Sequence, residues 1–290
     1  MATEELNAVC LPANREETWR VGSAVMRVLG IDLAAQPKAT GLVVLSRKTE
    51  GEEQHKWVAD LPLGPATDEC LIDLGSQVDV IGVDAPLGWP EPFVQAVLAH
   101  QSFEPWPGTE NRRPLTHRRT DDHVRDLGWG QPMSASADRL GSVAMRCALL
   151  QREWAKRWGA AAERDGSGRL IEVYPAAALR VWGISQPGYK GGTKAAADPA
   201  RTARNKIFAA VRTATESWLD LVAVSDKCVD SDHTLDALIS AIIALAAQSN
   251  ATSCPKSAED VKLAKTEGWI HVPIRPLELI RPPEGAPVRT

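Results

Sequence analysis

The sequence predicts an α/β fold, and two observations support this class. Three short β-rich runs follow one another within residues 26–61, joined by short links that contain Gly or Glu. Two later β-type runs, at residues 78–85 and 169–174, are separated from each other by segments with helical spacing. Short links suit antiparallel hairpins, and strands separated by helices suit a layered α/β arrangement. We therefore expect a mixed five-stranded sheet with flanking helices and a long loop/helix insertion.

An apolar pattern supports the strands that we predict at the start of the chain. Residues 26–33 (MRVLGIDL) form a compact apolar run that ends in an acid, and residues 40–47 and 54–61 give the second and third strands. Residues 65–77 then have helical spacing. Residues 78–90 (VDVIGVDAPLGWP) form a buried-type strand that stops at Pro86. An apolar run bounded by turn signals fits a central strand covered on both faces.

The second half of the chain is predicted to be mainly helical. Residues 104–133 are rich in Pro, Gly, Arg and His, and we expect a long ordered loop there. Helices are expected at about 138–164, 202–221 and 234–248, a strand at 169–174 and one edge strand in WIHVPI (269–274). No linker separates two cores. The predicted organisation is an arm at residues 1–22, one domain at 23–275 with insertions at about 104–135 and 183–200, and a Pro-rich tail at 276–290.

The composition limits the classes of protein to which the chain can belong. The five cysteines are odd in number, scattered and without C-x-x-C spacing, which argues against a disulfide framework or a structural zinc site and favours a reducing compartment. No signal segment is evident, and the longest apolar run, at residues 241–247, is far shorter than the roughly 20 residues that span a bilayer. We expect a soluble, cytoplasmic protein without a membrane partner. The net charge of -4 counts against a dedicated nucleic-acid coat protein, although a local basic patch and bound metal could still meet nucleic acid.

Acids at strand ends are the main functional signal. Asp32 ends the first strand and Asp84 ends the fourth, where ligands of α/β sheets usually bind. Carboxylate oxygens there are suited to hard cations such as Mg²⁺ or Mn²⁺. A third acid is expected from the helix at 234–248, where Asp236 lies beside the apolar stripe. Asp232, four residues earlier, either points the same way or caps the helix.

Two further features have both a functional and a structural interpretation. Glu172 interrupts an apolar strand, as a site residue or as a strand-surface or salt-bridge residue. A basic segment contains Arg112, Arg113, His117, Arg118, Arg119, His123 and Arg125. This segment has three interpretations: it holds phosphates, it is a solvated loop, or its arginines brace the carboxylates. Arg119 and Asp121 are expected to pair either with each other or with the site acids. His233 is expected at the surface or next to a metal ligand, and Trp89, Trp106 and Trp129 could stack on bases.

The order of elements, three hairpin strands followed by βα units, is that of the RNase H-like fold. Five segments in this order also resemble the family called domain of unknown function 429, described as predicted nucleases: GIDLA, IGVDAPLG, RRTD, IEVYPAA and LDALISA. The resemblance covers roughly residues 26–275. The last helix also resembles the final catalytic helix of Holliday-junction resolvases. The resemblance implies that Asp32 and Asp84 are metal ligands and Asp236 the helix acid. Resolvases and RNase H often have Glu where this chain has Asp84, whose shorter side chain alters the reach to a metal.

These observations together predict a divalent-metal-dependent nuclease that acts on DNA or RNA. Asp32, Asp84, Asp236 and Glu172 are the predicted catalytic residues, and Asp232 is a further candidate metal ligand. Two metal ions about 4 Å apart would activate water and stabilise the leaving oxygen. The predicted substrate contacts are Arg112, Arg113, Arg118, Arg119 and Asp121. The alternatives are a non-catalytic nucleic-acid-binding or scaffold protein, and a metal-dependent phosphohydrolase or ATPase acting on small nucleotides. The ATPase alternative is weakened because LAAQPKATG, after the first strand, contains a single Gly.

Overall fold

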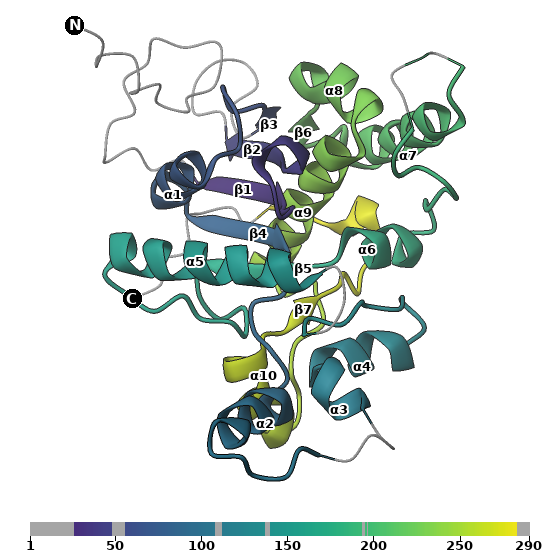
Figure 1. The fold of residues 1–290 in the computed structure, drawn as a ribbon. Coiled ribbons are helices and arrows are strands. Elements are labelled where there is room, and N and C mark those ends of the chain that lie inside the picture. The colour runs from purple at the N-terminus through teal and green to yellow at the C-terminus, as the bar shows by residue number, and fades with distance from the viewer. Residues whose placement is uncertain are drawn as a thin grey trace, which may run out of the picture.

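The central feature of the protein is a mixed sheet of seven strands (Figure 1). The structure, a computed structural model, describes residues 26–47, 56–107, 112–136, 140–192, 195 and 197–282. The strand order is β6-β3-β2-β1-β4-β5-β7. The strands are β1 (Arg27–Asp32), β2 (Gly41–Arg47), β3 (Trp57–Asp60), β4 (Val80–Asp84), β5 (Leu170–Val173), β6 (Leu219–Asp220) and β7 (Ile270–His271). The α/β class is confirmed.

The strand directions follow from the lengths of the connections. β1 pairs antiparallel with β2, and β2 pairs antiparallel with β3, as expected of strands joined by short links. β4 lies parallel to β1, and β5 lies parallel to β4. The predicted number of five strands is wrong, because β6 and β7 extend the two edges of the sheet, each by parallel pairing. β7 lies within the edge strand expected at 269–274, whereas β6 falls in a segment expected to be helical. A strand of two residues is too short to produce a recognisable alternation in the sequence.

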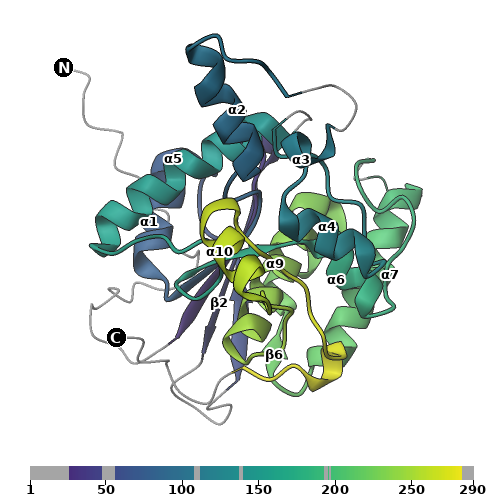
Figure 2. The ribbon, with the colours of Figure 1, turned by 90° about the horizontal axis from the view of Figure 1, so that it is seen from below.

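Helices cover both faces of the sheet (Figures 1 and 2). One face carries α1 (Asp68–Gln77) and α5 (Leu140–Trp158), which pack over Leu29 and Ile81. The other face carries α9 (Asp232–Gln248), which packs over Val28 and Val80. Because successive strand residues point to opposite faces, odd and even positions of β1 serve different cores. The α9 side is completed by α6 (Pro175–Val181), α7 (Pro199–Thr215) and α8 (Ser225–Asp230).

A group of four helices lies beyond the sheet, and we call it the helical cap. It consists of α2 (Glu91–Gln101), α3 (Arg113–Thr116), α4 (Arg119–Asp126) and α10 (Ala258–Glu267). The prediction that residues 104–133 form a loop is wrong for α3 and α4. The strongly polar α4 gives little periodic signal, since Val124 is its one buried apolar residue. At its start, the side chain of Asp121 accepts a hydrogen bond from the backbone N–H of Arg118. Single-turn 3₁₀ helices lie at Pro37–Ala39, Val222–Val224 and Leu277–Leu279.

Other expectations are met in part. The helix expected at 202–221 ends at Thr215, because Leu219 and Asp220 pair with β3. The expected arm at 1–22 lies outside the described residues. In the expected tail, Leu277 and Ile280 are buried in the core on the α9 side. Among the described cysteines, Cys147, Cys228 and Cys254 are free, whereas Cys70 is disulfide-bonded. Within the described part of the chain, every helix is too short or too polar to cross a membrane.

Candidate metal centre

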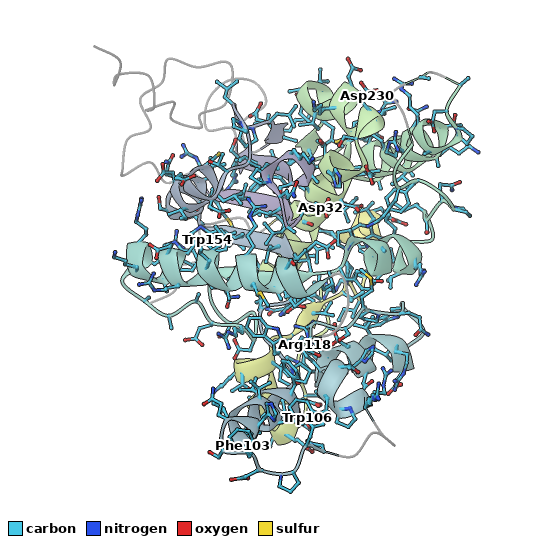
Figure 3. All side chains as sticks on the ribbon, viewed as in Figure 1. Asp32, Phe103, Trp106, Arg118, Trp154 and Asp230 are labelled. Carbon is cyan, nitrogen blue, oxygen red and sulfur yellow. The ribbon has the colours of Figure 1, made fainter. Side chains whose placement is uncertain are left out.

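Two acids stand side by side at the carboxyl ends of the central strands. Asp32 ends β1 and Asp84 ends β4, and the parallel register pairs these two residues directly. Each is preceded by the same pattern, Gly-x-Asp, and Gly30 and Gly82 are also register partners. Alternation along the strands places all four residues on the face that carries α9. Figure 3 shows Asp32 in the middle of the molecule, at the end of β1.

The glycines allow α9 to lie unusually close to the sheet. A Cβ on Gly30 would overlap the carbonyl oxygen of Ala237 and lie 2.6 Å from the backbone nitrogen of Ala241. A Cβ on Gly82 would overlap the carbonyl of Ser240 in the same way. Real Cβ atoms essentially never approach other atoms below 3.0 Å, so only glycine fits at these positions. This close approach brings the first turns of α9 over the strand-end acids.

Asp236 completes the cluster from α9. It is 1% exposed, and one carboxylate oxygen from each of Asp32, Asp84 and Asp236 lies within 4.8 Å of the others. We call these three residues the carboxylate centre. A set of convergent carboxylate oxygens is the donor chemistry that Mg²⁺ and Mn²⁺ prefer. The residues present therefore fit a divalent cation.

The electrostatics of the centre show an excess of negative charge. Burial raises the pKa of Asp84 well above its ordinary value, and the neighbouring charge of Asp32 raises it further. Burial also raises the pKa of Asp236 to about 6, with Lys190 opposing that shift. Among the described residues, the carboxylate of Asp84 has no hydrogen-bond partner. A partly buried carboxylate without a partner loses hydration, and a bound cation would compensate for that loss.

Three neighbours of the centre contact its acids directly. The Nζ of Lys190 lies 2.9 Å from Asp236, and the hydroxyl of Tyr189 donates to the same carboxylate at 3.0 Å. The Nδ1 of His233 lies 2.7 Å from Asp32, and this hydrogen bond raises the pKa of His233. His233 thus lies next to an expected ligand. Sequence reasoning did not identify Tyr189 or Lys190, because they lie in a Gly/Ala/Pro/Lys segment with no periodic pattern.

Asp232 lies next to the centre but outside the group of converging oxygens. Its side chain accepts a hydrogen bond from the backbone N–H of Gly191 at 3.0 Å. The interpretation of Asp232 as the cap of the helix is wrong, since the hydroxyl of Ser231 accepts the capping bond from Thr234. Asp232 instead ties the segment that carries Lys190 to the start of α9.

Glu172 points away from the carboxylate centre. It pairs in register with Val83, not with Asp84, so its side chain lies on the opposite face of the sheet. There it forms two hydrogen bonds with Arg118, at 2.6 and 2.8 Å, and accepts a third from the backbone of Leu87. Burial raises the pKa of Glu172, and Arg118 opposes that shift.

Arg118 is the hub of this second ionic network. It is 2% exposed. Its guanidinium donates to both oxygens of Asp121, both oxygens of Glu172 and the carbonyl of Glu267. All five guanidinium N–H groups are thereby used. We call Arg118, Asp121 and Glu172 the arginine hub, which joins β5 to the helical cap.

Most other arginines of the basic segment are also paired internally. The guanidinium of Arg113 donates to Asp122, and that of Arg119 donates to Asp260, both at 2.7 Å. Arg125 pairs with Asp122 and Asp126, and Arg112 is exposed at the start of α3. Of the three tryptophans considered for base stacking, Trp106 is 47% exposed, whereas Trp89 and Trp129 are partly buried.

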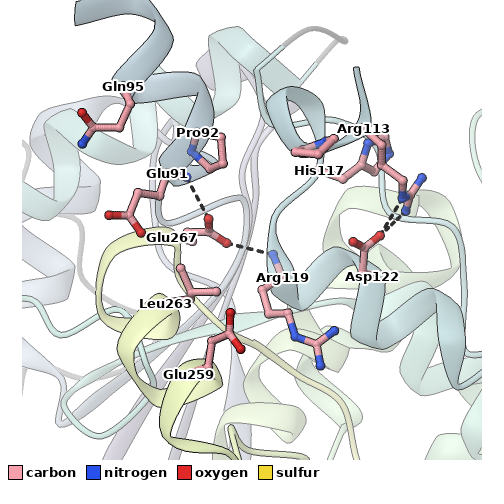
Figure 4. Close-up of a pocket in the computed structure, with 11 residues that line it drawn as sticks. Glu91, Pro92, Gln95, Arg113, His117, Arg119, Asp122, Glu259, Leu263 and Glu267 are labelled. Carbon is pink, nitrogen blue, oxygen red and sulfur yellow. Dashed lines mark hydrogen bonds and ion pairs between the residues drawn. The ribbon is translucent and has the colours of Figure 1, made fainter. Parts of the chain in front are cut away.

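A separate hollow of about 640 Å³ lies within the helical cap (Figure 4). Side chains of α2, α3, α4 and α10 line it, among them Glu91, Arg113 and Arg119. At its base, Glu267 accepts hydrogen bonds from the backbone N–H groups of Glu91 and Arg119, both at 2.8 Å. Glu267 thus joins the starts of α2 and α4. No residue of the carboxylate centre lines this hollow.

The fold and the centre together define an α/β protein with a candidate divalent-metal site at the carboxyl ends of two parallel strands. The sequence model of the family described as "Protein of unknown function (DUF429)" matches residues 30–260, which is most of the chain. The chain belongs to this family. No curated protein and no solved structure matches it.

Proposed function

We propose that this protein is a divalent-metal-dependent nuclease that hydrolyses phosphodiester bonds, built on an RNase H-like fold. The observation that carries the proposal is the convergence of Asp32, Asp84 and Asp236. Three antiparallel strands followed by parallel strands β4 and β5 support the fold assignment. Mg²⁺ or Mn²⁺ held by the three carboxylates would activate water and stabilise the leaving oxygen.

The residues around the centre have separate roles in this proposal. The three carboxylates bind the cation, and α9 holds Asp236 against the strand ends. His233 orients Asp32 through their hydrogen bond. Its side chain is 41% exposed, so the imidazole is also accessible to solvent. Tyr189 fixes the orientation of Asp236 in the same manner.

One observation favours a second candidate, a metal-dependent hydrolase of small phosphoesters such as nucleotides. The basic segment that was expected to follow a nucleic-acid backbone is largely occupied by internal ion pairs, and Arg118 lies buried. Affinity for a long nucleic acid depends on cationic side chains that neutralise successive phosphates. A small phosphoester needs fewer such contacts.

The proposal is tested by measuring Mg²⁺ and Mn²⁺ binding calorimetrically, followed by hydrolysis of duplex, branched and single-stranded DNA and RNA and of free nucleotides. We expect wild type to bind metal and to cleave polymers only when metal is present. Asp32→Asn and Asp84→Asn should abolish both while retaining the circular dichroism spectrum. Asp226→Asn, which neutralises an exposed acid on α8, is the matched control.

Each alternative has its own outcome in this experiment. Hydrolysis of nucleotides but not of polymers would replace the nuclease proposal with the second candidate. Binding of nucleic acid that is independent of metal, without cleavage, would favour a scaffold. Absence of metal binding by wild type, with or without nucleic acid, would refute metal-dependent hydrolysis altogether.

A further inference from the structure

Lys190 is a cationic side chain at the carboxylate centre, and hydrogen bonds to the residues on either side of it hold its backbone in place. Its Nζ lies 2.9 Å from Asp236, while 54% of the side chain remains exposed. The ammonium also interacts electrostatically with Asp84 and Asp32. One ammonium therefore faces three carboxylates.

The backbone on both sides of Lys190 is fixed by a buried arginine. Arg204, on α7, is 1% exposed. Its guanidinium donates to the carbonyls of Tyr189 and Gly191, at 2.9 and 2.7 Å, and to the carbonyl of Val229 at 2.8 Å. These bonds hold the two residues that flank Lys190.

Two further hydrogen bonds tie the same segment to α9. The N–H of Gly191 donates to Asp232, and the hydroxyl of Tyr189 donates to Asp236. A surface lysine in an ordinary ion pair has a freely rotating stem and contributes little to stability. Here the Cα of Lys190 is held on both sides, so the ammonium has a limited region to explore, next to Asp236.

We propose that Lys190 is a built-in cation of the carboxylate centre, so that the centre binds one divalent ion where it would otherwise bind two. The inference rests on the proposed function in taking the three carboxylates as metal ligands. Three carboxylates and one ammonium leave two negative charges, which one divalent ion neutralises. A second divalent ion would have to displace the ammonium or share the same oxygens with it, against mutual repulsion.

The proposed arrangement also gives Lys190 a role toward substrate. An ammonium is a compact point charge with three donors, which suits a single phosphate oxygen. Asp236 accepts from one of these donors, and 54% of the Lys190 side chain is exposed to solvent, from where a substrate would approach. Lys190 would thus contact the same phosphate that a divalent ion at the centre contacts.

The stoichiometry of Mn²⁺ binding tests this inference without reference to activity. Titration calorimetry counts the ions bound per chain, and electron paramagnetic resonance detects the spin coupling of two nearby Mn²⁺ ions. We expect wild type and Lys190→Arg to bind one ion without spin coupling. Lys190→Met keeps the length of the side chain but loses the charge. We expect it to bind two coupled ions, or to bind the first at least about tenfold more tightly. Lys262→Met, on the exposed side of α10, controls for the change in net charge.

The outcomes separate this inference from the proposed function. Two coupled ions in wild type, unchanged in Lys190→Met, would overturn the role of Lys190 and leave the metal-dependent nuclease intact. No ion in any variant would overturn the proposed function and this inference with it. Should Lys190→Met fail to fold, Lys190→Gln replaces it, and the single ion expected in wild type remains decisive.

Discussion

Gly30→Ala is predicted to separate α9 from the sheet and to weaken the carboxylate centre from a distance. The new Cβ would lie 2.6 Å from the backbone nitrogen of Ala241 and 2.8 Å from its Cβ, and it would overlap the carbonyl of Ala237. The ordinary range of Cβ contacts begins at 3.4 Å. The helix must therefore retreat by roughly 0.8 Å or more, the shift that the Ala241 nitrogen alone requires, because backbone atoms cannot rotate out of the way.

The expected cost has two measurable parts. Overpacking a well-packed core typically costs about 1–3 kcal/mol, and here the obstruction is backbone, so we expect about 3 kcal/mol in the free energy of unfolding. A displacement of about 1 Å at a catalytic constellation can cost on the order of 100-fold in rate. We accordingly expect Mn²⁺ affinity to fall by at least about tenfold, although residue 30 contacts no metal ligand through a side chain.

Urea unfolding and Mn²⁺ calorimetry of Gly30→Ala and Gly141→Ala test whether the close approach of α9 shapes the centre. Gly141 lies in the first turn of α5, and a Cβ there meets nothing within 4 Å. Gly141→Ala should therefore leave metal binding unchanged and stabilise the protein by up to about 1 kcal/mol. A Gly30→Ala protein that matched wild type in both stability and Mn²⁺ affinity would show that the close approach of α9 does not shape the centre.

Three other perturbations probe the charges. Asp84→Asn should abolish metal binding without destabilising the metal-free protein, and chelator-treated samples should unfold at an equal or higher urea concentration, since the change removes repulsion with Asp32. Arg118→Met should cost about 3–5 kcal/mol by leaving buried carboxylates unpaired, while Arg152→Met, at an arginine that is 79% exposed, should stay within about 0.5 kcal/mol. Burial lowers the pKa of His271 to about 4 from 6.5, so the unfolded chain binds a proton between these pH values that the folded chain does not. Its contribution to stability is present above pH 6.5 and should fall by up to about 3 kcal/mol as pH drops to 4, a slope that His271→Gln should remove in pH-dependent urea titrations.

The sequence predicts the strand-end acids because their signal is local. Asp32 and Asp84 each terminate an apolar run, and Asp236 falls at a fixed place beside the apolar stripe of α9. The repeated Gly-x-Asp pattern is an equally local signal that could have been used. It would have indicated that a helix crosses β1 and β4 at Gly30 and Gly82.

Other parts of the centre depend on contacts that only the folded chain creates. The sequence pattern groups Glu172 with the site acids because it interrupts an apolar strand, yet its face is decided by the register between β4 and β5, which a sequence does not contain. The segment that carries Lys190 is held at the centre because its neighbour Tyr189 accepts a hydrogen bond from Arg204 and its neighbour Gly191 donates one to Asp232. The edge strand β6 is formed by pairing with β3, not by its own pattern.

The carboxylate centre and the arginine hub occupy opposite faces of the same sheet, and their contrast distinguishes a binding site from a structural network. In the hub, each guanidinium N–H of Arg118 meets an acceptor, and both oxygens of Glu172 are bonded. In the centre, three carboxylates share one ammonium, one imidazole and one tyrosine hydroxyl, and Asp84 has no partner among the described residues. A closed network stabilises the fold and gains nothing from a ligand. A network with unpaired carboxylates lowers the stability of the fold until a cation binds. Mutations in the hub should therefore reduce stability, whereas mutations of Asp84 should reduce only metal affinity.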